Sequence, residues 1–166
     1  RGDAAKIFAG ERSGLKSVKG NFQKNGQLHW YMEPQVCYVE LDEGGQKLTV
    51  NSATQCPPAV QEAVAKVLGL DMCRIEVKHR RCGGGFGGKA SPSVHYASMA
   101  ALGALKTGQA VRLLLPREVD SLLVGGRERL DVEYELLLEE QTGLIKAAQV
   151  DILAAVGWRG GFGPMM

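Results

Sequence analysis

Hydrophobic and polar residues alternate along several stretches of the chain, a pattern typical of half-buried β-strands. The alternation is strictest over residues 130–136, where a hydrophobic side chain occupies every second position. A Thr-Gly turn then leads into a predicted partner strand over residues 144–156. A second hairpin is predicted from a strand rich in aromatic and β-branched residues at 29–41, which a Gly44-Gly45 turn joins to a return strand at 46–51.

Helical periodicity marks two longer segments. The first begins at Pro57-Pro58 and ends at Gly69, since proline suits the first turn of a helix and glycine suits its end. Four aliphatic side chains fall on one face of this segment: Val60, Val64, Val67 and Leu68. The second helix is alanine-rich, runs over residues 92–106 and ends at Thr107-Gly108.

Three shorter elements complete the prediction. A short helical pattern covers residues 4–9, an alternating strand covers 74–78, and an apolar run over 111–115 predicts a buried strand. Together these segments predict an α+β fold, with antiparallel hairpins and a mixed sheet with two main helices.

A glycine-rich run separates the strand at 74–78 from the second helix. Residues 83–88 contain five glycines and one phenylalanine, and Lys89 follows them. Glycine is costly inside regular elements and is kept where the backbone needs a positive φ or a close approach. A helix N-terminus offers free N–H groups and the positive end of a dipole. The run therefore predicts a loop that binds phosphate or another electron-rich group.

The glycine spacing leaves three interpretations open. It formally matches the dinucleotide fingerprint, but the acidic residue expected roughly 20 positions further on is absent, because position 108 is glycine. It nearly matches a P-loop, but Ala90 stands where a hydroxyl is needed for magnesium. A plain strand-to-helix turn would need only one or two of the five glycines.

Composition and charge exclude several classes of protein. The 166 residues are 45% hydrophobic and 23% charged, with a formal net charge of +2, as in an ordinary water-soluble domain. One basic cluster, residues 78–81, precedes the glycine run, and no aromatic residues are interleaved with it, so we expect no nucleic-acid partner. No leader and no long apolar span is visible, so we expect no membrane contact.

Four cysteines are scattered through the chain without any C-x-x-C pair: Cys37, Cys56, Cys73 and Cys82. This spacing predicts neither a zinc site nor an iron–sulfur site in the chain. It also fits a reducing compartment better than a disulfide framework, so we expect a cytoplasmic location.

Two motifs together resemble a known family. Residues 26–33 read Gly-Gln-Leu-His-Trp-Tyr-Met-Glu, similar to the G-Q-x-H-[FW]-Y-[LM]-E signature of the molybdenum hydroxylases. Residues 77–89 resemble the V-K-R-x-G-G-G-F-G-G-K segment that follows this signature in the xanthine dehydrogenase and aldehyde oxidase family. The resemblance implies that residues 1–157 are part of the molybdenum-cofactor-binding domain of a larger enzyme, and that residues 158–166 are a glycine-rich tail.

The resemblance also implies which residues bind the molybdenum–molybdopterin cofactor. The metal is held by the pterin dithiolene in this family, while Gln27 hydrogen-bonds an oxygen on molybdenum and Phe86 lies near the metal. The expected cofactor-binding residues are Gln27, Gly85, Phe86, Gly87, Gly88 and Arg159. Ala90 and Phe162 are expected on the substrate side. Arg159 and Phe162 belong to a segment that is either the family's second cofactor loop or an unrelated glycine-rich end.

The implied activity is hydroxylation of aldehydes or purine-like N-heterocycles with water as the oxygen source. Electrons would leave through iron–sulfur clusters and FAD in other domains or subunits, and the complete enzyme would be a homodimer. The glutamate that acts as general base lies in a region that this chain lacks, so we expect no catalytic residue here and no activity from the chain alone. The alternatives are a P-loop or dinucleotide-binding protein, or a non-catalytic remnant.

Residues beside the two motifs have competing roles. Xanthine-specific members carry glutamate directly after the loop lysine, and Ala90 at this position favours an aldehyde-oxidase-like pocket. Lys89 is expected either to contact a pterin phosphate or to be a solvated lysine at a helix start. Glu33 is expected to be a satisfied charge at the end of a strand, and His29 a structural residue on a strand.

Overall fold

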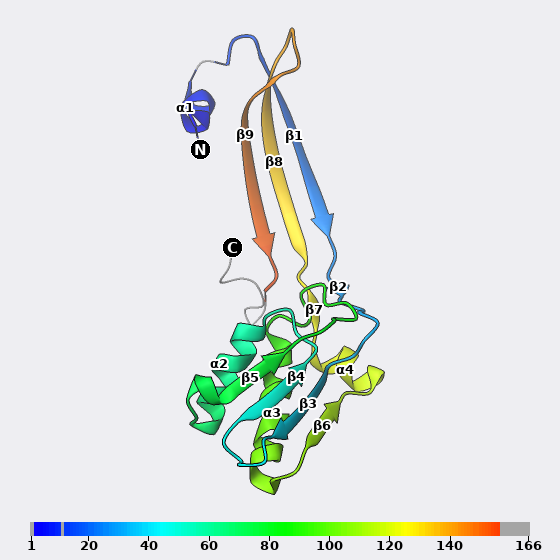
Figure 1. Ribbon diagram of the computed structural model, residues 1–166. Helices are drawn as coiled ribbons and strands as arrows, with labels where there is room; N and C mark the ends of the chain where they lie inside the picture. Colours follow the sequence, from blue (N-terminus) through cyan, green and yellow to red (C-terminus); the bar gives the residue numbers. More distant parts are fainter. Residues whose placement is uncertain (1, 11, 157–166) are drawn as a thin grey trace. The chain divides into compact units, whose positions relative to one another are not determined.

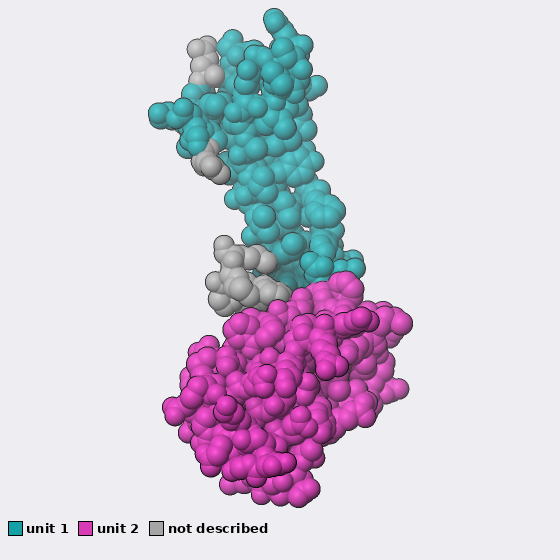
Figure 2. All heavy atoms as spheres, viewed as in Figure 1, with its two compact units in different colours: residues 1–27, 127–166 teal, residues 28–126 magenta. Residues whose placement is uncertain are grey.

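The computed structural model describes residues 2–10 and 12–156. The chain divides into two compact units, one formed by residues 1–27 and 127–166 and the other by residues 28–126 (Figure 2). The chain leaves the first unit through the short strand β2 (Gln27–Leu28) and returns to it through β7 (Gly126–Arg127). The second unit is therefore inserted between two segments of the first.

The first unit contains an antiparallel sheet of three long strands, ordered β1-β8-β9 (Figure 1). Its strands are β1 (Leu15–Lys24), β8 (Leu130–Glu139) and β9 (Ile145–Ala154), and the short helix α1 (Ala4–Ala9) contacts β9. The hairpin predicted from the alternation is confirmed as β8 and β9. Strand β1 was not predicted. It pairs with β8 over ten residue positions, on the side of β8 opposite to β9.

The second unit contains a four-stranded mixed sheet, ordered β5-β4-β3-β6. Its strands are β3 (Val36–Leu41), β4 (Leu48–Ser52), β5 (Ile75–Lys78) and β6 (Val111–Leu114). Strand β3 is antiparallel to both β4 and β6, whereas β4 and β5 run parallel. The helical elements are α2 (Pro57–Leu68), the 3-10 turn η1 (Met72–Arg74), α3 (Pro92–Thr107) and α4 (Arg117–Leu123). The mixed α+β class predicted from the sequence is confirmed.

The core of the second unit lies between this sheet and the two long helices (Figure 1). Val39 and Val50 face each other across the β3–β4 ladder and are fully buried, as is Val60 on α2. Helix α3 contributes small residues to this contact: Ala97, Ala100, Ala101 and Ala104. Cys37 lies in the same core, where burial raises the pKa of its thiol to about 12, so the thiol remains protonated and packs as an apolar group.

The helix ends follow the sequence signals. Gly69 and Gly108 both adopt the left-handed conformation with φ of 65°, and their N–H groups donate to the carbonyls of Ala65 and Ala104. A residue with a side chain would be strained at these positions, which explains why glycine ends both helices. None of the helices in the described residues is long and apolar enough to cross a membrane.

Four sequence-based assignments differ from the structure. The strand expected from residue 29 begins only at Val36, because Trp30 has a positive φ of 44° and Pro34 removes an N–H donor. Strand β6 alternates between half-buried and exposed residues instead of being buried, since it lies at the edge of its sheet. Val67 is 55% exposed although it was placed on the buried face of α2. Helix α4 was not predicted.

Candidate functional site

The glycine run at residues 83–89 forms an irregular loop between β5 and α3, as the sequence predicts. Gly84 and Gly87 adopt positive φ values of 95° and 92°, a conformation that side chains rarely permit. Phe86 also has a positive φ, 51°, although it carries a side chain, and that side chain is 63% exposed. A nonglycine residue in this region is strained and persists only when its surroundings hold it there.

His29 provides one of the contacts that hold Phe86. Its ring Nδ1 lies 3.0 Å from the carbonyl oxygen of Phe86. Because a carbonyl can only accept, the Nδ1 position must carry the proton. The structural role expected for His29 agrees with this contact, although His29 lies in no strand.

Three other glycines of the loop are required by packing within the protein. A Cβ at Gly88 would lie 2.6 Å from the ring of Tyr31 and 2.8 Å from that of His29. A Cβ at Gly83 would collide with the side chain of Glu33, and one at Gly85 with that of Gln55. These glycines therefore allow the backbone of the loop to pack directly against the side chains of the residues that contact it.

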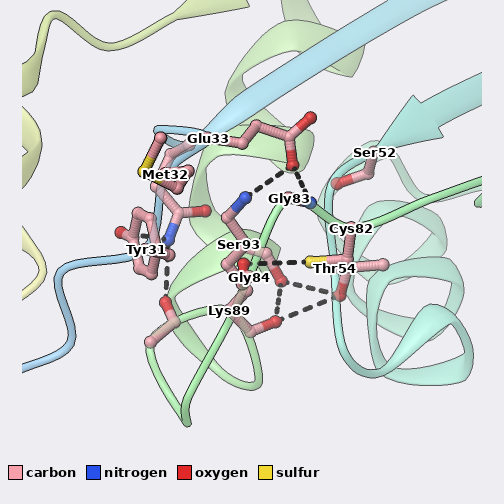
Figure 3. A network of polar contacts seen from close by, with 12 residues as sticks. Tyr31, Met32, Glu33, Ser52, Thr54, Cys82, Gly83, Gly84, Lys89 and Ser93 are labelled. Carbon is pink, nitrogen blue, oxygen red and sulfur yellow. Dashed lines mark hydrogen bonds and ion pairs between the residues drawn. The ribbon is translucent and has the colours of Figure 1, made fainter.

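Lys89, the last residue of the loop, forms an ion pair with Glu33 (Figure 3). The Lys89 side chain is fully buried, its Nζ lies 2.7 Å from Glu33 Oε2, and it lies 4.8 Å from the centre of the Tyr31 ring. Burial alone would raise the pKa of the Glu33 carboxyl, but hydrogen bonds from Lys89 and from the Gly83 N–H outweigh it, and the pKa is lowered. The satisfied charge expected at Glu33 agrees with this pairing, although Glu33 lies in no strand.

The expectation that Lys89 is a solvated lysine at a helix start is wrong, and its pairing with Glu33 does not favour the alternative, a phosphate contact. A fully buried ammonium is not solvated, and its short contact with Glu33 directs it into the protein and away from any phosphate outside. The same burial excludes the P-loop interpretation, because the lysine of a P-loop has to reach the phosphates of its nucleotide. Sequence reasoning missed this because a lysine at the start of a helix is usually exposed.

Gln55 holds the other end of the loop, and sequence reasoning did not identify it. Its side-chain Oε1 accepts hydrogen bonds from the N–H groups of Gly87 and Lys89, each at 3.1 Å. Its own backbone N–H donates to the Lys89 carbonyl at 2.9 Å, and Ser93 Oγ donates to the same carbonyl, also at 2.9 Å. The one signal in the sequence is its position two residues before Pro57, which places Gln55 next to the start of α2. Nothing in the local sequence indicates its contact with the glycine loop.

A buried polar network joins the loop to α4. Gln35 Nε2 donates to the Gly88 carbonyl at 2.8 Å and lies 3.1 Å from the Tyr31 hydroxyl. That hydroxyl donates to Asp120 on α4 at 2.9 Å, and Asp120 is 2% exposed. Burial and the hydrogen bond to Asp120 raise the pKa of Tyr31, so the hydroxyl remains a proton donor. Arg117 lies 3.6 Å from the same carboxylate and partly balances its charge.

Three consecutive N–H groups of the loop have no partner among the described residues; they belong to one half-buried, one buried and one exposed residue. Within the described residues, no hydrogen-bond acceptor pairs with the backbone N–H of Gly84, Gly85 or Phe86. Successive N–H groups in a turn with alternating φ signs form an electropositive concavity that favours anions. This donor set suits a negatively charged group or a polarised oxygen.

The predicted site residues fall into three groups. The structure places Gly85, Phe86, Gly87, Gly88 and Ala90 together in one loop of the second unit. Gln27 is exposed and belongs to the first unit. Arg159 and Phe162 lie outside the described residues. Within residues 2–10 and 12–156, no group of three or more His, Cys, Asp or Glu side chains is arranged to hold a metal ion.

Comparison with known proteins identifies the class. The whole chain, residues 1–166, matches the family described as the molybdopterin cofactor-binding domain. The chain belongs to this family, and the resemblance read from the two sequence motifs is confirmed.

The relatives are enzymes much longer than this chain. Indole-3-acetaldehyde oxidase from Zea mays is 37% identical over 151 residues, which cover 91% of this chain and 11% of that protein. Xanthine dehydrogenase from Oryza sativa subsp. japonica is 37% identical over 135 residues, 81% of this chain and 10% of its own length. The structure of an aldehyde oxidoreductase from Desulfovibrio gigas matches with a TM-score of 0.81 and 25% identity, covering 98% of this chain and 17% of that one. The chain thus spans about a tenth of the length of these curated relatives.

Proposed function

We propose that this chain forms part of the cofactor site of a molybdenum hydroxylase that oxidises aldehydes or electron-poor N-heterocycles. The observation that carries the proposal is the row of three N–H groups at residues 84–86 that find no acceptor in the described part of the chain, on a loop whose other amides are paired within the protein. N–H groups that the fold already holds in position stabilise a negative charge well, because the loop does not have to rearrange when the charged group binds.

The loop fits the molybdopterin group on its donor chemistry. The dithiolene and phosphate of the pterin are anionic, and the free backbone N–H groups of Gly84, Gly85 and the exposed Phe86 are suitable partners for them. In the proposed arrangement the cofactor is contacted by Gln27, Gly85, Phe86, Gly87, Gly88 and Arg159. Gln27 and the backbone of Phe86 would hold the metal end of the group. When bound, the molybdenum centre supplies the redox and hydroxylation chemistry.

Ala90 and Phe162 are proposed to face the substrate. Ala90 directly follows the buried Lys89 and carries no group that could pair with a purine ring. A purine-binding carboxylate at this position would add a charged hydrogen-bond partner, which a small apolar side chain does not replace. Aldehydes are therefore the preferred substrate class within this proposal.

The remaining parts of the enzyme are proposed to lie outside this chain. They comprise the general base, the iron–sulfur clusters and the FAD that receive the electrons, and the second subunit of a cytoplasmic homodimer. Residues 1–157 are proposed as part of the cofactor domain and residues 158–166 as its tail. One face of the β1-β8-β9 sheet supports the need for further polypeptide, since Phe22 and Ile152 lie in one cross-strand row and are 60% and 61% exposed.

Cofactor content tests the proposal. The chain is produced in cells that synthesise molybdopterin, purified, and assayed for molybdenum and for pterin. We expect molybdenum and pterin in equal, substoichiometric amounts. Gln27→Ala, which shortens an exposed side chain, should retain less of both. A chain that retains neither molybdenum nor pterin contradicts the proposal. A rise in melting temperature with millimolar ATP or NAD, in place of cofactor retention, would favour a nucleotide site.

A further inference from the structure

We propose that Glu33 and Gln55 are positioning residues that hold the loop at residues 83–89, so that the N–H groups of residues 84–86 face the ligand. The ligand named here is the molybdopterin cofactor, so this part of the inference rests on the proposed function. The hold on the loop is a property of the chain itself and can be measured without any ligand.

Glu33 closes the loop by joining its two ends. Its Oε2 atom accepts a hydrogen bond from the Gly83 N–H at 2.9 Å and another from the Lys89 ammonium at 2.7 Å (Figure 3). The backbone N–H of Glu33 donates in return to the Gly83 carbonyl at 3.0 Å. One carboxylate oxygen therefore fixes the first and the last residue of the loop relative to each other.

Gln55 fixes the second half of the loop. Its Oε1 accepts hydrogen bonds from the N–H groups of Gly87 and Lys89, which lie two residues apart. Both N–H groups must therefore point toward Gln55, which fixes the conformation of the backbone between them. Gly85 lacks a Cβ where the Gln55 side chain passes, which lets this contact form. The Gly88 N–H is paired within the loop, with the Gly85 carbonyl at 2.8 Å.

The carbonyls of residues 83–85 explain why the N–H groups of residues 84–86 point away from the groups that hold the loop. In a trans peptide the carbonyl and the following N–H point in opposite directions. The Gly83 carbonyl accepts from Glu33, so the Gly84 N–H points away from Glu33. The two following carbonyls are also occupied, that of Gly84 by Cys82 Sγ at 3.2 Å and that of Gly85 by the Gly88 N–H.

Each free N–H thus belongs to a peptide whose carbonyl is already held by the protein. A loop held in this way loses little conformational entropy when it binds a ligand, which favours affinity. The positive φ of Phe86 belongs to the same arrangement, since a strained residue needs neighbours that hold it. Glu33 and Gln55 need not touch the cofactor to influence its binding.

Replacement of Gln55 by a matched pair of variants tests the inference. Gln55→Leu removes the acceptor, whereas Gln55→Glu keeps an oxygen at the same place. In the ligand-free chain, hydrogen exchange followed by NMR is expected to be about tenfold faster at the Gly87 and Lys89 amides in Gln55→Leu and near the wild-type rate in Gln55→Glu. The amides of β3 and β4 report on folding and should not change in either variant.

Cofactor retention is the second readout. We expect Gln55→Leu to retain severalfold less molybdenum and pterin than the wild type and Gln55→Glu to recover most of the loss. Wild-type exchange rates at Gly87 and Lys89 in Gln55→Leu overturn the inference, and so does faster exchange with unchanged retention. A wild-type chain without any cofactor refutes the proposed function instead, while the exchange rates still show whether Gln55 holds the loop.

Discussion

Glu33→Gln should destabilise the second unit, because it leaves the Lys89 ammonium buried without its charged partner. The Lys89 side chain is 0% exposed, whereas that of Glu33 is 34% exposed. Removing one member of a fully buried pair costs about 3–5 kcal/mol. Here water reaches Glu33 and a glutamine oxygen can still accept, so we expect about 1.5–3 kcal/mol, the range for hydrogen bonds to charged groups.

Urea unfolding followed by circular dichroism at 222 nm measures this change. Both long helices, α2 and α3, belong to the second unit, so the helical signal reports mainly on its unfolding. Lys89→Met serves as the matched partner, since it removes the buried charge and leaves Glu33 with the Gly83 N–H and solvent. The double variant should be more stable than the sum of the two single losses predicts.

The pH dependence provides a second check with a defined sign. The pKa of Glu33 is lowered in the folded state from an ordinary value of 4.5, so its contribution is fully present above that value and is lost as the pH falls through the folded pKa. Glu33 faces Lys89 and the Gly83 N–H, with His79 nearby. The stability gap between wild type and Glu33→Gln should therefore shrink below pH 4.5. A constant gap, or a coupling energy in the double variant below about 0.5 kcal/mol, would refute the reasoning.

Three further outcomes follow from the same contacts. Gly88→Ala places a Cβ 2.6 Å from the Tyr31 ring and should cost about 1–3 kcal/mol in urea unfolding, whereas Gly44→Ala, with its nearest contact at 3.7 Å, should change little. Tyr31→Phe leaves buried Asp120 without the hydroxyl donor, and a loss of about 1–3 kcal/mol is expected, so an unchanged unfolding midpoint contradicts the network. The isolated chain should not turn over aldehydes or purines even with cofactor added, and product formation above a Gln27→Ala control in a steady-state assay would show that the general base lies within it.

Local signals were sufficient for much of this fold. The period-2 alternation located the β8–β9 hairpin, and the glycines that follow α2 and α3 located the ends of those helices. These features depend on side-chain direction and on φ within a few residues, so they can be read along the chain. The glycine loop was also located correctly, because five glycines in six positions suit no regular element.

Contacts between distant residues could not be predicted in the same way. Lys89 is 56 residues from Glu33 in sequence, and Gln55 is 32 residues from Gly87. Whether a charged side chain is solvated or buried depends on what the folded chain places opposite it, and the local sequence around Lys89 gives no sign of Glu33. The sequence alone thus determined where the loop lies and why it is rich in glycine, whereas only the tertiary structure decided which of its amides are paired and which remain free, since that depends on acceptors brought from elsewhere in the chain.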